Sequence, residues 1–292
     1  MNALDILVTG ATSGIGRQTA LDLARAGHRV FASGRRADAL KSLADAARGT
    51  KLETVVMDVT KDESIAAARA QILAATGGRG LDALVNNAGY GAVGPLEEIT
   101  DAALRAQYDT NVFGLMAVTR AFLPEMRARS FGRIVNVSSI GGRMTFPLMG
   151  AYNSTKYAVE SLSDALRIEL KPFGVRVSII EPGSIKTEFA DVALGTAPEA
   201  NGSPYAGAMA EAEAIRQKFD AAAVGPEVIS RAIQKAIESK NPSARYVAPF
   251  SGRVMLFLAR TLPTSWFDAL LGSMSGLTKA KLLPKAGGLA TA

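Results

Sequence analysis

The sequence predicts a doubly wound α/β fold, in which helices cover both sides of one parallel sheet. Two patterns predict it: short apolar runs alternate with longer segments of helical spacing, and a glycine-rich turn joins the first run to the first helix. Composition agrees, because 48% of the 292 residues are hydrophobic and 21% are charged, which is enough apolar surface for a large core. A mainly disordered chain is excluded.

Seven short apolar runs are predicted as strands, and several are apolar throughout, as expected for strands covered on both faces. They are 6–9, 29–32, 53–57, 83–85, 133–137, 176–180 and 245–247. Between them, helical spacing predicts helices over 16–26, 64–75, 102–127, 152–171 and 227–238. Because helices join consecutive strands, the sheet should be parallel.

One domain is predicted over residues 1–250, followed by a helical C-terminal extension over 251–292. No internal repeat and no Gly/Ser linker divides the chain before residue 250. Residues 188–224 interrupt the alternation with Gly, Pro and small side chains, and a connection of this length is typical of a lid over a substrate site.

The chain has no cysteine and one histidine, which limits its chemistry. Without cysteine it has no disulfides, no thiolate metal ligands and no cysteine nucleophile, so a cytoplasmic location is expected. His28 is expected in a solvent-facing turn, and we expect no metal site. The first residues lack a basic segment followed by a long apolar run, so no signal peptide is predicted.

The net charge of +6 is concentrated near the C-terminus. From residue 241 onward six basic residues stand against one acidic residue, which leaves the first 240 residues almost neutral. A nearly neutral body without aromatic residues among basic ones argues against a nucleic-acid partner.

The turn after the first predicted strand is typical of a dinucleotide-binding loop. Residues 9–16 read Thr-Gly-Ala-Thr-Ser-Gly-Ile-Gly, so Gly10, Gly14 and Gly16 have the spacing Gly-x-x-x-Gly-x-Gly. Glycines let the backbone approach a pyrophosphate closely, and the N-terminus of the following helix supplies unpaired N–H groups. The pattern predicts a Rossmann-like fold that binds a nicotinamide dinucleotide.

Arginines after the second predicted strand indicate which dinucleotide is bound. NAD enzymes usually have an acidic residue there, which binds the adenosine ribose hydroxyls. This chain has Arg35 and Arg36, and an arginine can bind a 2′-phosphate that a carboxylate would repel. We therefore predict NADP(H), with Asp58 and Val59 beside the adenine.

Tyr152 and Lys156 carry the predicted chemistry. They stand four residues apart at the start of a predicted helix, so their side chains share one face. A free phenol titrates near pH ~10, and a neighbouring ammonium would lower that pKa, which makes Tyr152 a candidate general acid/base. Ser139 follows the fifth predicted strand, where a hydroxyl can point into the crevice. Asn111 inside a predicted helix indicates a hydrogen-bonding role, because asparagine is unfavourable there.

With these motifs in this order, the sequence resembles the short-chain dehydrogenase/reductase family over about residues 4–250. The resemblance implies that Tyr152 donates a proton, that Lys156 holds the nicotinamide ribose and lowers the Tyr152 pKa, and that Ser139 polarises the carbonyl. It also implies that Asn111 keeps a water for proton relay. The implied cofactor-binding residues are Gly10, Ser13, Gly14, Ile15, Gly16, Arg35, Arg36, Asp58, Val59, Asn86, Ala88, Gly89, Tyr152, Lys156, Pro182, Gly183, Ile185 and Thr187.

The predicted function is hydride transfer between NADP(H) and a secondary alcohol or ketone. Residues 161–170 and 181–183 resemble the steroid and retinol dehydrogenase branch, and the lid segment carries few charges before Glu211, which favours an apolar substrate. A 3-oxoacyl thioester reductase is the competing enzyme, whose carrier protein would need a basic patch such as Arg143 and the tail. A non-catalytic NADP-binding regulatory protein is a third interpretation, although its usual mark, a broken catalytic set, is missing.

The resemblance also implies a homodimer or homotetramer paired through helices over 102–127 and 152–171. The apolar stripe of Val159, Leu162, Leu166 and Leu170 fits such a contact or the domain core equally well.

The extension holds two apolar stretches within 254–274, broken at Pro263, and neither reaches the ~20 residues needed to span a bilayer. It either docks on its own domain or a sister subunit, or makes a peripheral contact with an anionic membrane through its basic cluster and Trp266.

Overall fold

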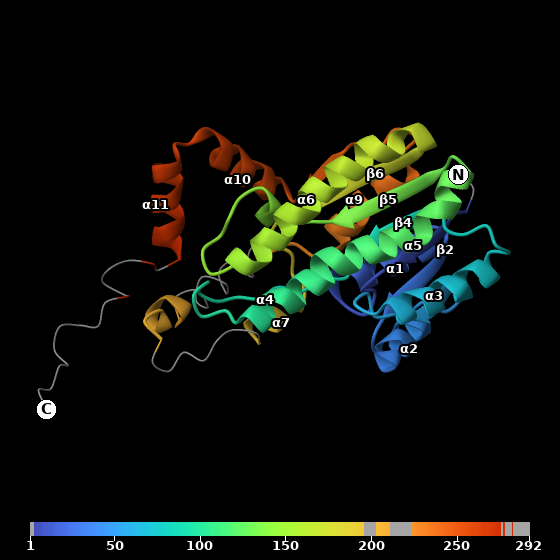
Figure 1. The fold of residues 1–292 in the computed structure, drawn as a ribbon, viewed down its shortest axis with the longest axis horizontal. Helices are drawn as coiled ribbons and strands as arrows, with labels where there is room; N and C mark the ends of the chain where they lie inside the picture. Colours follow the sequence, from blue (N-terminus) through green and yellow to red (C-terminus); the bar gives the residue numbers. More distant parts are fainter. Residues whose placement is uncertain (1–2, 196–202, 211–222, 276, 278–281, 283–292) are drawn as a thin grey trace, which may run out of the picture.

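Seven parallel strands form one sheet at the centre of the protein (Figure 1). The computed structural model describes residues 3–195, 203–210, 223–275, 277 and 282. The strands are β1 Asp5–Val8, β2 Arg29–Gly34, β3 Leu52–Val56, β4 Ala83–Asn86, β5 Gly132–Val137, β6 Val175–Pro182 and β7 Arg245–Ala248. Their order is β3-β2-β1-β4-β5-β6-β7. The doubly wound fold is confirmed, and each predicted strand ends within two residues of its observed limits.

Helices cover both faces of this sheet (Figure 1). One face packs against α1 Gly14–Arg25, α2 Ala37–Ala46 and α9 Glu227–Glu238, and the other against α3 Asp62–Ala75, α5 Leu115–Ala128 and α6 Gly150–Leu170. Successive strand residues alternate between the two cores: Ile6 and Val8 lie in the first and Leu7 in the second. The central strands β1 and β4 are therefore almost entirely apolar, because both of their faces are buried.

The strand order brings the predicted motifs to one edge of the sheet. β1 lies between β2 and β4, so the chain crosses to opposite sides of β1, and a crevice forms at the carboxyl ends of the strands around such a point. The glycine turn follows β1, residues 87–89 follow β4, Ser139 follows β5, and residues 183–187 follow β6. Segments far apart in the sequence thus meet at this edge.

The long helix predicted over 102–127 is interrupted in the structure. It consists of α4 Asp101–Tyr108, a π-helical segment Asp109–Gly114 and then α5. The wider turn places Asn111 where its side chain bonds outside its own helix, to Tyr90 and Thr155. A π-helical turn of this kind is frequent at functional sites.

One expectation is corrected, and one open alternative is decided. His28 does not face solvent: it is buried, its Nδ1 accepts from the Leu4 amide at 3.2 Å, and its Nε2 lies 3.2 Å from Glu238 on α9. The stripe on α6 belongs to the domain core, because Leu166 and Leu170 are buried against the sheet. In both cases the packing of a distant element decides the environment.

The described part of the C-terminal extension forms two helices, α10 Phe250–Thr261 and α11 Thr264–Met274, and Pro263 precedes the second. They project beyond the end of the sheet (Figure 1). Within the described ranges, no helix is both long enough and apolar enough to cross a membrane.

Candidate active site

The glycine turn is pressed against the chain that leaves β4. A Cβ at Gly10 would lie 2.8 Å from the Ala88 Cα, and a Cβ at Gly16 would lie 2.3 Å from the Gly10 carbonyl oxygen, so only glycine fits at either position. Gly10 also has a φ of +64°, which favours glycine. We refer to this closely packed turn, residues 9–16, as the cradle.

The N-terminus of α1 opens into this cradle. The helix begins at Gly14, its N-cap Ser13 makes no side-chain capping bond, and its first turn carries no acidic residue. Its first N–H groups and its positive dipole end are therefore available to an anion. These features fit the pyrophosphate of a dinucleotide, which Ser13, Gly14, Ile15 and Gly16 would hold.

Asn87 holds the cradle in place, although it is not among the predicted cofactor-binding residues. Its Nδ2 donates to the carbonyl oxygens of Thr9 and Gly10 at 3.0 and 3.1 Å, while the Thr9 hydroxyl accepts from the amides of Asn87 and Ala88. The predicted cofactor residue Asn86 points the other way: it is buried and donates to Thr119 and Asn136 at 2.9 Å. Alternation along a strand could have separated the two asparagines.

Arg35 and Asp58 lie close together where β2 and β3 end. Burial raises the pKa of Asp58, but hydrogen bonds from Thr60 and the charge of Arg35 outweigh it, so this pKa lies below its usual value. Arg35 and Arg36 are exposed, so both can reach a ligand at this end of the crevice. The arginines are thus exposed beside Asp58, at the carboxyl ends of β2 and β3.

Tyr152, Lys156 and Ser139 meet at the start of α6. Tyr152 is buried, and its ring packs edge-on against Phe189 of α7 Phe189–Leu194, with 5.2 Å between ring centres. The Lys156 Nζ lies 5.7 Å from the centre of the Tyr152 ring, and a hydrogen bond joins the Tyr152 phenol to Ser139. Residues predicted from two motifs therefore meet in one polar group, in which Tyr152 and Lys156 are buried and Ser139 is partly buried.

The pKa of Tyr152 differs from the expectation. Burial raises it to about 12, and the hydrogen bond with Ser139 offsets this only in part. Burial also lowers the pKa of Lys156 to about 8, against the opposing charge of Glu160. The Tyr152 pKa thus lies above its usual value, whereas the sequence predicted a lowering by Lys156; the Lys156 Nζ donates at 2.8 Å to the Val137 carbonyl.

Asn111 joins the segment after β4 to the catalytic helix. Its Nδ2 donates to the Tyr90 carbonyl at 2.9 Å and to the Thr155 hydroxyl at 3.0 Å, and its Oδ1 accepts from the Tyr90 amide at 3.1 Å. A Cβ at Gly89 would lie 3.0 Å from that Oδ1 and 3.8 Å from the Lys156 Nζ. Asn111 and Lys156 therefore border the same narrow space beside Gly89.

The segment after β6 contacts the glycine turn. The Gly183 amide donates to the Ala248 carbonyl at 2.8 Å, and Ile185 forms a bridge with Val224. A Cβ at Gly14 would lie 3.1 Å from Thr187, so this segment touches the N-terminus of α1. Of the predicted lid over 188–224, residues 196–202 and 211–222 lie outside the described residues.

Ion pairs to the buried carboxylates of Glu160 and Glu181 connect α6 to the sheet. Arg245 of β7 lies 3.1 Å from both Glu160 and Glu181 and 2.6 Å from Asp164, and Arg143 lies 3.1 Å from Glu181. Burial raises the pKa of Glu160 and of Glu181. The cluster joins α6 to β6 and β7 and, through Arg143, to the turn after Ser139.

A dinucleotide cradle beside a buried Tyr-Lys-Ser group defines a nicotinamide-dependent oxidoreductase. Comparison with known proteins agrees: the short chain dehydrogenase family matches residues 5–195. The chain is 35% identical over 266 residues to the uncharacterized oxidoreductase YbbO of Escherichia coli K12, covering 91% of this chain and 93% of that protein. The chain belongs to the short-chain dehydrogenase family.

Other relatives have named substrates. The chain is 36% identical over 240 residues to a 3-ketodihydrosphingosine reductase of Bacteroides thetaiotaomicron, covering 82% of this chain and 86% of that one. It is 35% identical over 253 residues to human 17-beta-hydroxysteroid dehydrogenase type 1, covering 82% and 76%. A short-chain dehydrogenase structure from Streptomyces avermitilis has a TM-score of 0.76 at 35% identity, covering 96% and 98%. Similar solved structures include complexes with NADP and with NAD.

The buried Lys156 should make the fold less stable at neutral pH than a neutral side chain would. Its pKa falls from 10.5 to about 8 on folding, so Lys156→Met should raise the free energy of unfolding by ~3 kcal/mol near pH ~7. Between about pH 8 and pH 10.5, Lys156 is protonated in the unfolded chain and mostly neutral in the folded protein. The unmodified protein therefore becomes more stable as pH rises through this range, and the difference in stability between it and Lys156→Met becomes smaller. Urea unfolding of both proteins near pH ~7 and pH ~9.5 measures this. A variant that is less stable by the same amount at both pH values contradicts the burial effect.

Proposed function

We propose that this protein is an NADP(H)-dependent oxidoreductase that acts on a secondary alcohol or ketone of an apolar substrate. One observation supports this proposal most strongly: Tyr152, Ser139 and Lys156 meet beside the dinucleotide cradle. The bound cofactor would supply or accept the hydride, and the side chains described here would orient the substrate and move its proton.

The raised pKa of Tyr152 supports a role as proton donor. At neutral pH the phenol is protonated, which is the form that carbonyl reduction needs. The Ser139 hydroxyl bonds to the same phenol, so a carbonyl oxygen near both groups would be polarised and then protonated. Lys156 lies beside Gly89 and would hold the nicotinamide ribose. Asn111 would hold the backbone at Tyr90, next to Gly89, in place. The water relay through Asn111 stays a prediction.

The exposed Arg35 supports NADP(H) over NAD(H). It lies at the carboxyl end of β2, and its charge acts on Asp58 across the adenine end of the crevice. Arg36 would assist it. A 2′-phosphate there would gain charge-assisted hydrogen bonds that the hydroxyl of NAD lacks.

Apolar side chains around the catalytic group support an apolar substrate. Phe189 packs on Tyr152, and the buried Ala193 lies with it against Gly91. Relatives named for a long-chain 3-keto substrate and for a 17-beta-hydroxysteroid support the same class. Arg143 is paired with Glu181, so it is less suited to form a patch for an acyl carrier protein.

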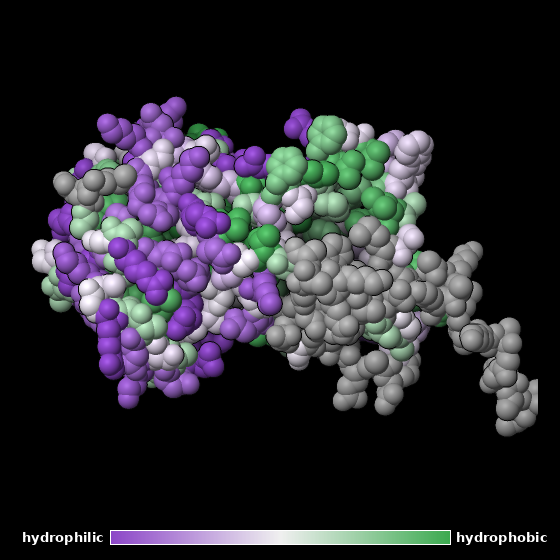
Figure 2. Space-filling model, turned by 180° about the vertical axis from the view of Figure 1, so that it is seen from behind, coloured by the Kyte–Doolittle hydropathy of each residue, from purple (hydrophilic) through white to green (hydrophobic). Residues whose placement is uncertain are grey.

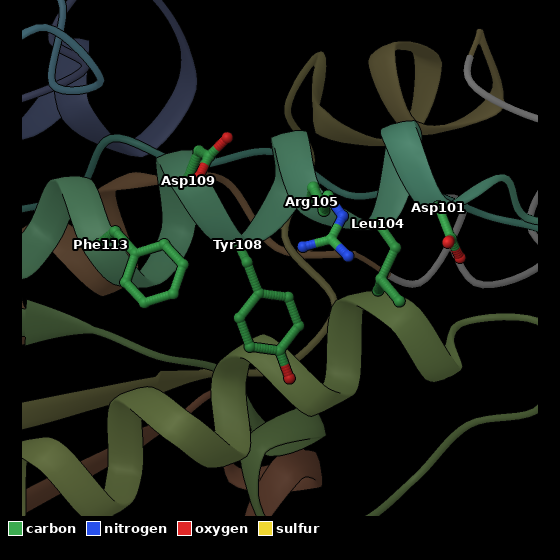
Figure 3. Close-up of a pocket in the computed structure, with 6 residues that line it drawn as sticks. All are labelled: Asp101, Leu104, Arg105, Tyr108, Asp109 and Phe113. Atoms are coloured by element: carbon green, nitrogen blue, oxygen red, sulfur yellow. The ribbon is translucent and has the colours of Figure 1, made fainter.

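We also propose a cytoplasmic homodimer or homotetramer, paired through the run from α4 to α5 and through α6. Exposed apolar side chains on these helices support it: Phe113 is 60% exposed and Ile168 is 65% exposed. A hollow of about 460 Å³ lies beside Phe113, and Leu104, Tyr108 and Phe113 extend from one side of the helical run (Figure 3). Asn111 points inward from the same run, so this hollow is separate from the catalytic group.

Cofactor preference tests the arginine. The unmodified protein should bind NADPH more tightly than NADH by ~1.5–3 kcal/mol, the range for hydrogen bonds to charged groups. Arg35→Asp should remove or reverse this difference in a fluorescence titration, whereas Arg48→Asp, the same charge change at an exposed arginine of the loop after α2, should preserve it. Equal dissociation constants for NADPH and NADH in the unmodified protein would overturn the proposal.

Turnover tests the catalytic group. NADPH oxidation should be measured with steroid, retinoid, long-chain 3-keto and acyl-thioester carbonyls. With the best ketone, Tyr152→Phe should lower turnover by at least ~10²–10⁴ while NADPH binding persists. Tyr157→Phe removes an exposed hydroxyl from the same helix and should be nearly silent. Near-normal turnover of Tyr152→Phe would refute the assignment, and preference for an acyl thioester would refute the substrate class.

Light scattering tests the assembly. The unmodified 30.5 kDa chain should give the mass of a dimer or tetramer at micromolar concentration. Ile168→Glu places a charge on the proposed contact and should raise the dissociation constant at least ~10-fold. Val56→Glu changes an equally exposed apolar residue of β3 and should leave the mass unchanged. A monomeric unmodified protein contradicts the proposal.

A further inference from the structure

The two C-terminal helices have an inward face that packs on the catalytic domain. Phe267 and Leu271 of α11 are buried against Met144, together with Met255 and Leu258 of α10. A Cβ at Gly252 would lie 3.1 Å from the Ile140 side chain and 3.9 Å from the Gly183 Cα. The helix pair is therefore seated on the chain between Ser139 and Tyr152, and its orientation relative to the active site is set.

The outward face of the same pair is apolar. On α10, Phe250 is 73% exposed, Val254 43% and Phe257 64%, and on α11, Trp266 is 69% and Leu270 39% exposed. Helical spacing of three and four residues aligns the α10 side chains in one stripe. A surface helix normally presents polar residues to water, so this stripe departs from the usual pattern. Figure 2 shows apolar side chains gathered at its upper right, over these helices.

The charged residues on this outward face, and those that follow it in the sequence, are almost all basic. Arg253 and Arg260 are exposed on α10, which contains no acidic residue. Neither arginine has an ion-pair partner within the described ranges. From residue 250 to the end of the chain there are five basic residues and one acidic residue, Asp268. The face therefore complements a negatively charged, apolar partner.

We propose that the outward face of α10 and α11 binds the surface of an anionic lipid bilayer, with both helices lying on it. Aromatic side chains flanked by arginines are typical of helices that lie at a bilayer interface, and anionic headgroups attract each nearby basic residue. The helices have 12 and 11 residues, so each is too short to span a bilayer and long enough to lie on one.

A second copy of the chain fits this face less well. A two-fold contact would place the same face on both partners, so Arg253 and Arg260 of one copy would approach those of the other. Such like charges destabilise a contact that buries them. A lipid surface, by contrast, supplies the opposite charge and accepts the apolar stripe without shape complementarity.

Membrane binding would bring the bilayer close to the segment between Ser139 and Tyr152, because the inward face of the helix pair contacts Ile140 and Met144 of that segment. An apolar substrate of the proposed reaction would then have a short path from lipid to the site. The path of the substrate from the membrane rests on the proposed function, whereas membrane binding does not. Either one can therefore be disproved without the other.

Co-sedimentation of the full chain with vesicles tests the proposal. Binding to vesicles that contain phosphatidylserine should be strong at low salt, weaken as salt rises, and exceed binding to pure phosphatidylcholine. Phe257→Ser with Trp266→Ser should reduce binding roughly tenfold or more. Arg253→Gln with Arg260→Gln should reduce binding to the anionic vesicles by a similar factor and leave binding to the neutral ones unchanged.

Matched controls use residues outside this face. Phe173→Ser removes an exposed aromatic ring after the far end of α6, and Arg48→Gln removes an exposed charge, and neither should change binding. Failure of the unmodified chain to bind anionic vesicles overturns the proposal, and so does equal loss of binding in the controls. A lower oligomer mass of Phe257→Ser/Trp266→Ser would assign the face to a second copy instead.

Trp266 gives a measurement that needs no variant, because it is the single tryptophan of the chain. It is mostly exposed, so its fluorescence should shift to the blue and resist acrylamide quenching when anionic vesicles are added at constant protein concentration. An unchanged spectrum contradicts the proposal. A blue shift that grows with protein concentration in the absence of vesicles indicates self-association and also overturns it.

Discussion

The close contact between the glycine turn and the chain after β4 is the constraint on which the site depends. Gly10 and Gly16 leave no space for a side chain, and Asn87 joins the two segments through its amide. This contact sets the N-terminus of α1 and positions Gly89. Through Gly89 it reaches Asn111 and Lys156, so the cradle and the catalytic group form one unit built on one edge of the sheet.

Burial is the second feature that shapes the chemistry. It raises the pKa of the Tyr152 phenol, lowers that of Lys156, and raises those of Glu160 and Glu181. Each group is therefore displaced toward its neutral form by a poorly polarisable surrounding. Arg245 offsets part of this cost for the carboxylates through direct ion pairs, while Lys156 donates a hydrogen bond to the uncharged Val137 carbonyl. The candidate catalytic groups Tyr152 and Lys156 thus stand at positions that are unfavourable for their charged forms.

The helix pair at the C-terminus connects the site to the surface. Its inward face contacts the chain between Ser139 and Tyr152, and its outward face presents aromatic side chains and arginines. The sequence posed docking on the fold and contact with a membrane as alternatives. The structure shows docking, and the opposite face of the same helices stays open for the second interaction.

The sequence by itself determined the strands, the parallel direction of the sheet and the candidate residues of the site. Apolar runs, glycine spacing and the Tyr-Lys interval are local patterns, and local patterns express period and backbone freedom. The tertiary structure alone decided that Asn86 and Asn87 face opposite ways, that 109–114 is a π-helical turn, that His28 is buried, and that the Tyr152 pKa rises. Each of these depends on what a distant element places beside the residue, and burial and through-space contacts of that kind leave no local pattern in the sequence.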